Sequence, residues 1–170
     1  MNILIVNGSG SIGSSIVNKL SDTDAKVIYT TNQSDSKNID GCIHWKYEGE
    51  ESVSSLYEVI KQKFDQLDAV VNCLGSIFLK PAHLTSKEDF DNTIDINLRS
   101  SFFILKETIP LMRKHGGNIL FFSSSAANIG MVNHEAISAA RGGLKGLVRS
   151  AAATYAKNNI RINALALGLV

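Results

Sequence analysis

A glycine-rich segment near the start of the chain has the spacing of a phosphate-binding loop. Residues Gly8, Ser9, Gly10, Ser11, Ile12 and Gly13 read G-x-G-x-x-G, directly after an apolar run and at the opening of a helical pattern. Such glycines let the backbone approach a pyrophosphate, and the following helix N-terminus offers N–H groups and a positive dipole end. The alternative is a tight turn without a ligand, but strand, loop and helix all stand where the fingerprint requires them. We therefore predict that these residues bind a dinucleotide.

The end of the second predicted strand bears on which dinucleotide binds. In the usual arrangement, a carboxylate at this place binds the 2′-hydroxyl of the adenosine ribose. Here the strand ends in Thr30, Thr31 and Asn32, and the next carboxylate is Asp35. Hydroxyl and amide groups do not repel a 2′-phosphate, although no Arg is placed to pair with it. Thr31 and Asn32 therefore favour NADP weakly over NAD as the cofactor.

The elements that must position this loop alternate along the chain. Short apolar runs rich in β-branched residues alternate with longer stretches of helical period, which is typical of βαβ units. Strands are predicted at 3–7, 26–31, 42–46, 69–72, 118–122 and 161–165, and helices at 11–20, 51–64, 87–114 and 133–157. Right-handed crossovers put helices on both faces of a parallel sheet. The sequence predicts an α/β fold with a doubly wound, Rossmann-like parallel sheet in three layers, α/β/α.

Composition limits the class of protein. The 170 residues are 44% hydrophobic and 19% charged, which suits one domain over 1–170 with an ordinary core. A net charge of +1 gives no field that would attract nucleic acid or a membrane surface. The first apolar run is too short for a signal peptide or a membrane span. Cys42 and Cys73 lie far apart without clustered histidines, so neither a disulfide nor a metal site is indicated. We expect a cytoplasmic protein.

Two segments on the cofactor side resemble the short-chain dehydrogenase/reductase family, and the similarity runs over the whole chain. Residues 68–75 resemble the N-N-A-G stretch after that family's fourth strand, which lies against the cofactor, with Asn72 and Gly75 at the matching positions. Residues 94–98 resemble the helix asparagine that helps hold a water and the active-site lysine, with Asn97 at the matching position. A purely structural role for Asn97 remains the alternative.

Two further segments resemble the family's catalytic side. Residues 117–125 resemble the fifth strand and its catalytic serine, which matches Ser124, although a serine run can also simply cap a strand end. Residues 160–168 resemble the sixth strand and its N-x-x-x-P-G turn. The resemblance implies an NAD(P)-dependent oxidoreductase that transfers hydride between carbonyl and hydroxyl groups of an unidentified small-molecule substrate. It also implies a homodimer or homotetramer built on the helices at 87–114 and 133–157.

The family's Y-x-x-x-K pair is replaced. Its tyrosine and lysine fall on Ile137 and Arg141. Isoleucine has no proton to give, and Arg141 can lend charge and bind ribose hydroxyls but titrates too high to relay a proton. His134, one helical neighbour before Ile137, is a conceivable replacement acid, although a histidine near a helix start is more often a surface residue. Without a replacement, we expect slow or absent carbonyl reduction.

Other departures support a second hypothesis. The glycine loop is one residue shorter than the family's usual G-x-x-x-G-x-G, and the chain ends at Val170, before the family's last helix and strand. We therefore expect those two elements to be lacking from these 170 residues. The alternative to an oxidoreductase is a dinucleotide-binding module with impaired catalysis, which would act as a sensor or an assembly subunit.

Overall fold

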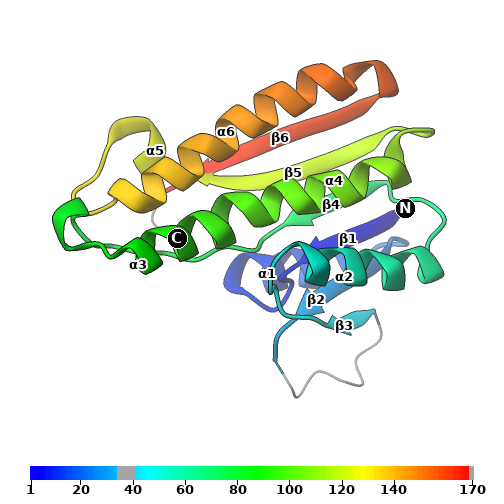
Figure 1. Ribbon diagram of the computed structural model, residues 1–170. Coiled ribbons are helices and arrows are strands. Elements are labelled where there is room, and N and C mark those ends of the chain that lie inside the picture. Colours follow the sequence, from blue (N-terminus) through cyan, green and yellow to red (C-terminus); the bar gives the residue numbers. More distant parts are fainter. Residues whose placement is uncertain (34–40, 169–170) are drawn as a thin grey trace.

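The computed structural model describes residues 1–33 and 41–168, and six parallel strands form one sheet within them (Figure 1). The strand order is β3-β2-β1-β4-β5-β6. The strands are β1 (Asn2–Val6), β2 (Lys26–Thr31), β3 (Cys42–His44), β4 (Ala69–Asn72), β5 (Gly117–Ser124) and β6 (Ile160–Leu167). The order reverses between β1 and β4, so the carboxyl ends of these two strands open the crevice where such sheets bind ligands.

Helices cover both faces of this sheet. On one face, α2 (Glu50–Lys63), α4 (Ser100–Met112) and α6 (Glu135–Tyr155) lie across the strands (Figure 1). The helix α1 (Ser11–Leu20) contacts β1 and β2. The chain moves from β1 toward β2 but in the opposite direction from β4 to β5, so right-handed crossovers put α1 and α4 on opposite faces. The predicted doubly wound fold is confirmed.

The central strand β1 is buried from both sides. Leu4 and Val6 join the core cluster that also holds side chains of α2, α4 and α6, whereas the alternate residues Ile3 and Ile5 are buried outside that cluster. Successive side chains of a strand point to opposite faces, which is why a strand covered on both faces is apolar throughout. The loop that follows β1 is thereby anchored in the middle of the sheet.

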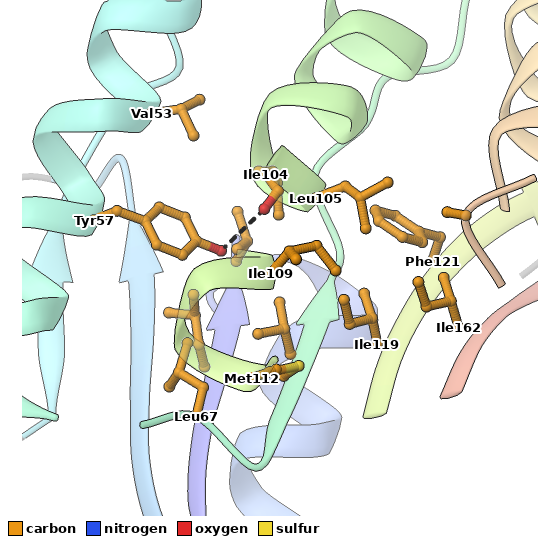
Figure 2. Close-up of a cluster of buried hydrophobic side chains, with 14 of the residues drawn as sticks. Val53, Tyr57, Leu67, Ile104, Leu105, Ile109, Met112, Ile119, Phe121 and Ile162 are labelled. Carbon is orange, nitrogen blue, oxygen red and sulfur yellow. Dashed lines mark hydrogen bonds between the residues drawn. The ribbon is translucent and has the colours of Figure 1, made fainter. Parts of the chain in front are cut away.

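A buried tyrosine joins α2 to α4 (Figure 2). Tyr57 has no exposed surface, and its hydroxyl donates to the carbonyl of Ile104 at 3.4 Å and shares a hydrogen bond with the Thr108 hydroxyl. Burial raises the pKa of Tyr57 above its usual range, so the hydroxyl stays protonated. The ring contributes apolar area while its polar end is satisfied. This contact fixes α4, which directly follows the segment that carries Asn97.

The predicted helix at 87–114 is divided in the structure. It consists of α3 (Lys87–Ile94), a π-helical turn, η3 (Asp95–Arg99), and α4. Ser86 caps α3 in a capping box with Asp89. Within the wide turn, the side-chain amide of Asn97 donates to the carbonyl of Thr93 at 2.9 Å. Side-chain bonding to the preceding turn competes with the regular ladder, and single π turns of this kind are frequent at functional sites.

Other boundaries differ by a few residues from the sequence prediction. Within the described residues the structure adds two short helices that were not predicted, η2 (Ala82–Leu84) and α5 (Ala126–Ile129). The helix predicted at 133–157 ends in a separate short helix, η4 (Ala156–Asn158). The strand β3 stops at His44 and β6 continues to Leu167. Element ends depend on partner strands and caps rather than on hydrophobic period, so sequence reasoning places them less well. Across the described residues, the helices are all too short or too polar to cross a bilayer.

We predict that Gly13→Ala destabilises the fold. A Cβ at Gly13 would lie 2.4 Å from the carbonyl oxygen of Asn7 and 2.7 Å from the Cα of Gly8, both backbone atoms that cannot move without shifting α1 from the sheet. Overpacking of this kind costs about 1–3 kcal/mol in the free energy of unfolding, measured by urea denaturation. The matched control is Gly146→Ala in α6, where nothing lies within 4 Å, and which should be neutral or stabilising by up to about 1 kcal/mol. Equal stability of both variants would contradict the packing described.

Candidate functional site

The three glycines of the loop after β1 have different surroundings. A Cβ at Gly8 would lie 2.6 Å from the Cβ of Tyr29, and one at Gly13 would collide with backbone, so both glycines serve close packing. A Cβ at Gly10 would come nearest to the side-chain amide of Asn7, at 3.1 Å. Gly10 is also the N-cap of α1, and no side chain of the described residues caps that helix. The backbone N–H groups of the first turn are therefore available to an anion.

Asn7, which sequence reasoning missed, joins the ends of three strands. It adopts the left-handed conformation, with φ of 60°. Its backbone N–H donates to the Thr30 hydroxyl at 2.8 Å, and its side-chain amide donates to the carbonyl of Cys73 at 3.3 Å. Asparagine tolerates this conformation better than most residues. An Asn between an apolar strand and the first glycine was the signal that could have identified it.

Thr31 and Ser9, both predicted to bind cofactor, bond to each other. The Thr31 hydroxyl donates to Ser9 Oγ at 2.8 Å and accepts from the backbone N–H of Gln33 at 3.1 Å. Thr31 is 1% exposed, so it braces the glycine loop from behind. Asn32 lines a small cavity beyond the strand end. Asp35, the first carboxylate after this strand, lies outside the described residues.

The loop after β4 is held by two buried asparagines. Asn72 donates from its side-chain amide to Ser101 Oγ at 3.2 Å and accepts from the N–H of Leu74 at 3.0 Å. Asn97 accepts from the N–H of Ser76 at 3.0 Å and donates to Ser76 Oγ at 3.1 Å. Neither asparagine lines the two cavities found at this edge of the sheet in the described residues. Together with the bond to Thr93, these contacts satisfy both the oxygen and the nitrogen of the Asn97 side-chain amide with groups of the protein. This supports the structural alternative for that residue.

Arg141 lies against this same loop. Its guanidinium donates to the carbonyl of Phe122, and a Cβ placed on Gly75 would be 2.1 Å from Arg141 Nη2. Burial lowers the pKa of Arg141, and no charged neighbour contributes to that shift. An arginine nevertheless stays protonated in proteins. The Arg141 cation is therefore largely buried, and its hydrogen bond goes to a backbone carbonyl. Among the described residues, no carboxylate lies within ion-pair range of it.

A cavity of about 480 Å³ lies at the carboxyl ends of β1, β4 and β5. Its lining brings together the glycine loop, the loop after β4, the serine run after β5 and the start of α6. The residues of this lining singled out from the sequence are Gly10, Ser11, Ile12, Gly13, Gly75, Ser124, His134, Ile137 and Arg141. No Asp or Glu of the described chain is among the lining residues. Because Arg141 lines it, the cavity carries a positive charge.

A second cavity of about 260 Å³ adjoins the first. The two share Asn7, Leu74, Gly75 and Ser76, and the smaller one extends past the end of β2 to residues of the 45–47 segment. Trp45, Lys46 and Tyr47 of this segment were not predicted as site residues. Trp45 and Lys46 were predicted as the end of the third strand, at 42–46, and Tyr47 follows it, so the sequence carried no other signal for them. The shared lining makes one elongated site that follows the carboxyl edge of the sheet.

The serine run has two separate roles. The Ser123 hydroxyl donates to the backbone carbonyl of Arg141 at 3.0 Å and so ties β5 to α6. Ser124 Oγ accepts from the N–H of Ala126 at 3.2 Å, and Ser124 also lines the larger cavity. Both alternatives raised for Ser124 are thus compatible with its position. Beside it, Ile137 is 4% exposed and presents an apolar wall.

Two other polar residues near the site do not act as acids or bases in this geometry. Lys145 donates to the carbonyl of Ala127 at 2.8 Å and to the side chain of Asn128, which fastens α5 to α6. Burial raises the pKa of Cys73 to about 12, so its thiol is protonated at neutral pH. In the described ranges, no group of three or more His, Cys, Asp or Glu side chains gathers as a metal site would require.

Comparison with known proteins identifies the family. A family model described as enoyl-(acyl carrier protein) reductase matches residues 6–170. Hydroxynaphthalene reductase-like protein Arp2 of Metarhizium anisopliae is 35% identical over 117 residues, which are 68% of this chain and 43% of that protein. Cyclopentanol dehydrogenase of Comamonas sp. is 33% identical over 129 residues, which are 75% of this chain and 52% of that protein. The chain thus spans about half the length of these curated relatives.

Solved structures agree with this assignment. A structure described as ElxO with NADP bound superposes with a TM-score of 0.89 at 25% identity, and the match covers 99% of this chain and 73% of that one. The chain belongs to the short-chain dehydrogenase/reductase family of oxidoreductases.

The contact between Gly75 and Arg141 gives a prediction. Gly75→Ala forces the guanidinium away from the loop, so we expect it to lower the free energy of unfolding by about 1–3 kcal/mol. In an Arg141→Ala background the nearest remaining atom to the added methyl group is Asn97 Oδ1 at 3.1 Å, so the loss should be smaller. Urea denaturation of the wild type, both single variants and the double variant should give a coupling of about 0.5–3 kcal/mol. Additive effects would show that the two residues do not touch.

Proposed function

We propose that this chain is an NAD(P)-dependent oxidoreductase, or the dinucleotide-binding part of one, that transfers hydride between carbonyl and hydroxyl groups. The observation that carries the proposal is the open backbone at Gly10 and the uncapped N-terminus of α1, which face a cavity at the reversal point of the sheet. A family of oxidoreductases and a solved neighbour with NADP bound support the same reading.

The residues present fit a nicotinamide dinucleotide. Gly10 leaves a cradle that a side chain would fill, and the adjoining cavities give an elongated site with no carboxylate in the described lining. The first turn of α1 would bind the pyrophosphate, and Asn32 with the 45–47 segment would face the adenosine end. When bound, the nicotinamide supplies the hydride or accepts it.

Ser124 and Arg141 would act at the other end of the site. The Ser124 hydroxyl lines the larger cavity and would orient a substrate oxygen. Arg141, beside Gly75, would bind ribose hydroxyls and place a positive charge near the developing oxyanion. In water-poor surroundings such a charge stabilises an anion more than it would in bulk solvent.

A binding module without turnover is the second candidate function. The observation that favours it is Ile137, which puts an apolar wall in the larger cavity at the position of the family's tyrosine. Binding of a reduced cofactor without its consumption by any carbonyl compound would favour this candidate over the oxidoreductase.

We predict that NADPH binds somewhat more tightly than NADH. The polar, uncharged end of β2 does not repel a 2′-phosphate, but no arginine is placed there to pair with it. The difference in Kd should therefore stay within about tenfold, or 1.4 kcal/mol. Fluorescence titration of both reduced cofactors measures this preference. Equal or reversed affinities would contradict it.

The control for cofactor binding is Gly10→Val. The three atoms nearest to its Cβ would all belong to Asn7, and the nearest, at 3.1 Å, is the side-chain amide nitrogen, so we expect the fold to persist. The branched side chain would fill the approach to the loop, and binding of both cofactors should be lost. A Gly10→Val protein that binds NADPH as the wild type does would remove the loop from the site.

We also infer that two copies of the chain pair through the outer surfaces of α4 and α6. Phe102 on α4 is 50% exposed, and small residues on α6 permit close helix packing. We expect a dimer or tetramer by light scattering at micromolar concentration, and a shift to monomer in Phe102→Glu. Leu84→Glu, at a residue 57% exposed in η2, is the control and should leave the assembly intact. A monomeric wild type would overturn this inference.

A further inference from the structure

We propose that His134 is the acid–base residue of this site and takes the place of the missing tyrosine. The inference rests on the proposed oxidoreductase function and adds to it the source of the proton. His134 is half-buried at the N-cap of α6 and lines the larger cavity together with Ser124, Ile137 and Arg141. Histidine is the side chain whose ordinary titration lies between pH 5 and 8.

The hydrogen bonding of the imidazole defines which nitrogen is free. His134 Nδ1 lies 2.7 Å from the carbonyl oxygen of Val132. A carbonyl oxygen can only accept, so Nδ1 carries a hydrogen in both the neutral and the charged ring. The remaining nitrogen, Nε2, therefore holds the lone pair of the neutral imidazole or the acidic proton of the imidazolium. It is the atom that exchanges a proton.

The backbone around His134 is fixed from several directions. Its N–H donates to the carbonyl of Met131 at 3.3 Å, and its own carbonyl accepts from the N–H of Ser138 at 2.7 Å. The preceding residue, Asn133, accepts from the N–H of Lys80 at 2.8 Å. These bonds tie the start of α6 to the loop after β4. A residue that moves protons needs a defined position relative to its substrate, and this anchoring supplies it.

His134 lies at the start of the helix that carries the two replaced residues. Ile137 and Arg141 are four residues apart on one face of α6, and His134, the N-cap, stands three residues before Ile137. All three residues line the same cavity. The charged or titratable groups that line the cavity with His134 are Arg141 from α6 and Cys73 from the loop after β4. Burial keeps Cys73 a neutral thiol at neutral pH. In the described lining, His134 is the residue whose side chain can both give and take a proton.

The proposed step balances as follows for reduction. The carbonyl carbon of the substrate receives a hydride from the dihydronicotinamide, and the π electron pair of the carbonyl moves to its oxygen. That oxygen takes the proton from Nε2–H of the imidazolium, which becomes a neutral imidazole. The substrate would be reduced to an alcohol and a bound dihydronicotinamide oxidised to the nicotinamidium form. One proton taken up from solution would then restore the imidazolium at Nε2. Oxidation of an alcohol is the reverse.

Turnover of wild type and variants is the first test. With saturating NADPH and cyclohexanone, 2,3-butanedione or benzaldehyde, His134→Gln should lower kcat by about 10²- to 10⁴-fold, as loss of a general acid does. The affinity for NADPH, from fluorescence titration, should be unchanged. His115→Gln, an exposed residue before β5 at the other end of the sheet, is the matched control and should act as wild type.

Two rescues separate catalysis from a structural role. Free imidazole should restore part of the activity of His134→Gly, because it can fill the vacated space and donate a proton. In the His134→Gln background, Ile137→Tyr with Arg141→Lys restores the family's pair and should also recover turnover. If His134 only supported the start of α6, free imidazole would not restore activity to His134→Gly. Recovery by the tyrosine and lysine alone would then show only that the site lacks an acid.

A second readout does not depend on turnover. In ¹H–¹⁵N imidazole spectra of the protein saturated with NADP⁺, cyclohexanol should move the Nε2 resonance of His134 and leave that of His115 in place. If the wild type binds NADPH but reduces none of the three carbonyls, this spectrum decides: a shift supports the proposal and its absence overturns it. Full activity of His134→Gln also overturns it. Absence of NADPH binding by the wild type is a different result and overturns the proposed function with it.

Discussion

Asn7 is the junction on which the site depends, because the ends of three strands meet through its polar groups. Its backbone N–H bonds to Thr30 of β2, its side-chain amide to the carbonyl of Cys73 after β4, and its carbonyl accepts from the N–H of Gly10. The same carbonyl is the atom that a side chain at position 13 would strike. The left-handed backbone of Asn7 turns the chain sharply enough for α1 to pack this close. The open loop at Gly10 follows from that turn.

The polar side chains around the site are divided between those that shape it and those that face it. Asn72, Asn97 and Thr31 are almost fully buried, and their hydrogen bonds hold the loops from behind. Such buried groups must be bonded internally, because an unsatisfied one costs about 1–3 kcal/mol. Arg141, Ser124 and His134 remain to face the cavity. The shape is thus set by amides and hydroxyls, and the positive charge by Arg141.

Ile137 and Arg141, which stand where the family has tyrosine and lysine, remove the usual proton donor but leave the surrounding strands and loops in place. Gly75 lies under Arg141 and Asn97 lies beside both, so the arginine is accommodated by the loop after β4. Behind it, the π turn that carries Asn97 is held in place through α4, which Tyr57 joins to α2 (Figure 2). An isoleucine at 137 keeps the cavity wall apolar and raises the effective strength of nearby charges. We propose that proton transfer is then left to the imidazole of His134, three residues before Ile137.

Much of the fold was determined by local sequence signals. The predicted bounds of α1, β2 and β4 are those of the structure, because glycine spacing and apolar period act over a few neighbouring residues. The same local signals identified the family and the glycine loop. They could not show the π turn within 87–114, since one wide turn leaves the hydrophobic period almost unchanged.

Only the tertiary structure decided which predicted site residues face the cavity and which make their hydrogen bonds to other groups of the protein. Thr31 turns to Ser9, Asn97 to Ser76, and His134 joins Ser124 and Ile137 at one wall. The partners of these side chains come from segments far apart in the sequence. A residue's type states which hydrogen bonds it can make, but the packing of strands and helices decides which partner lies within reach, and therefore which polar groups are left for a ligand.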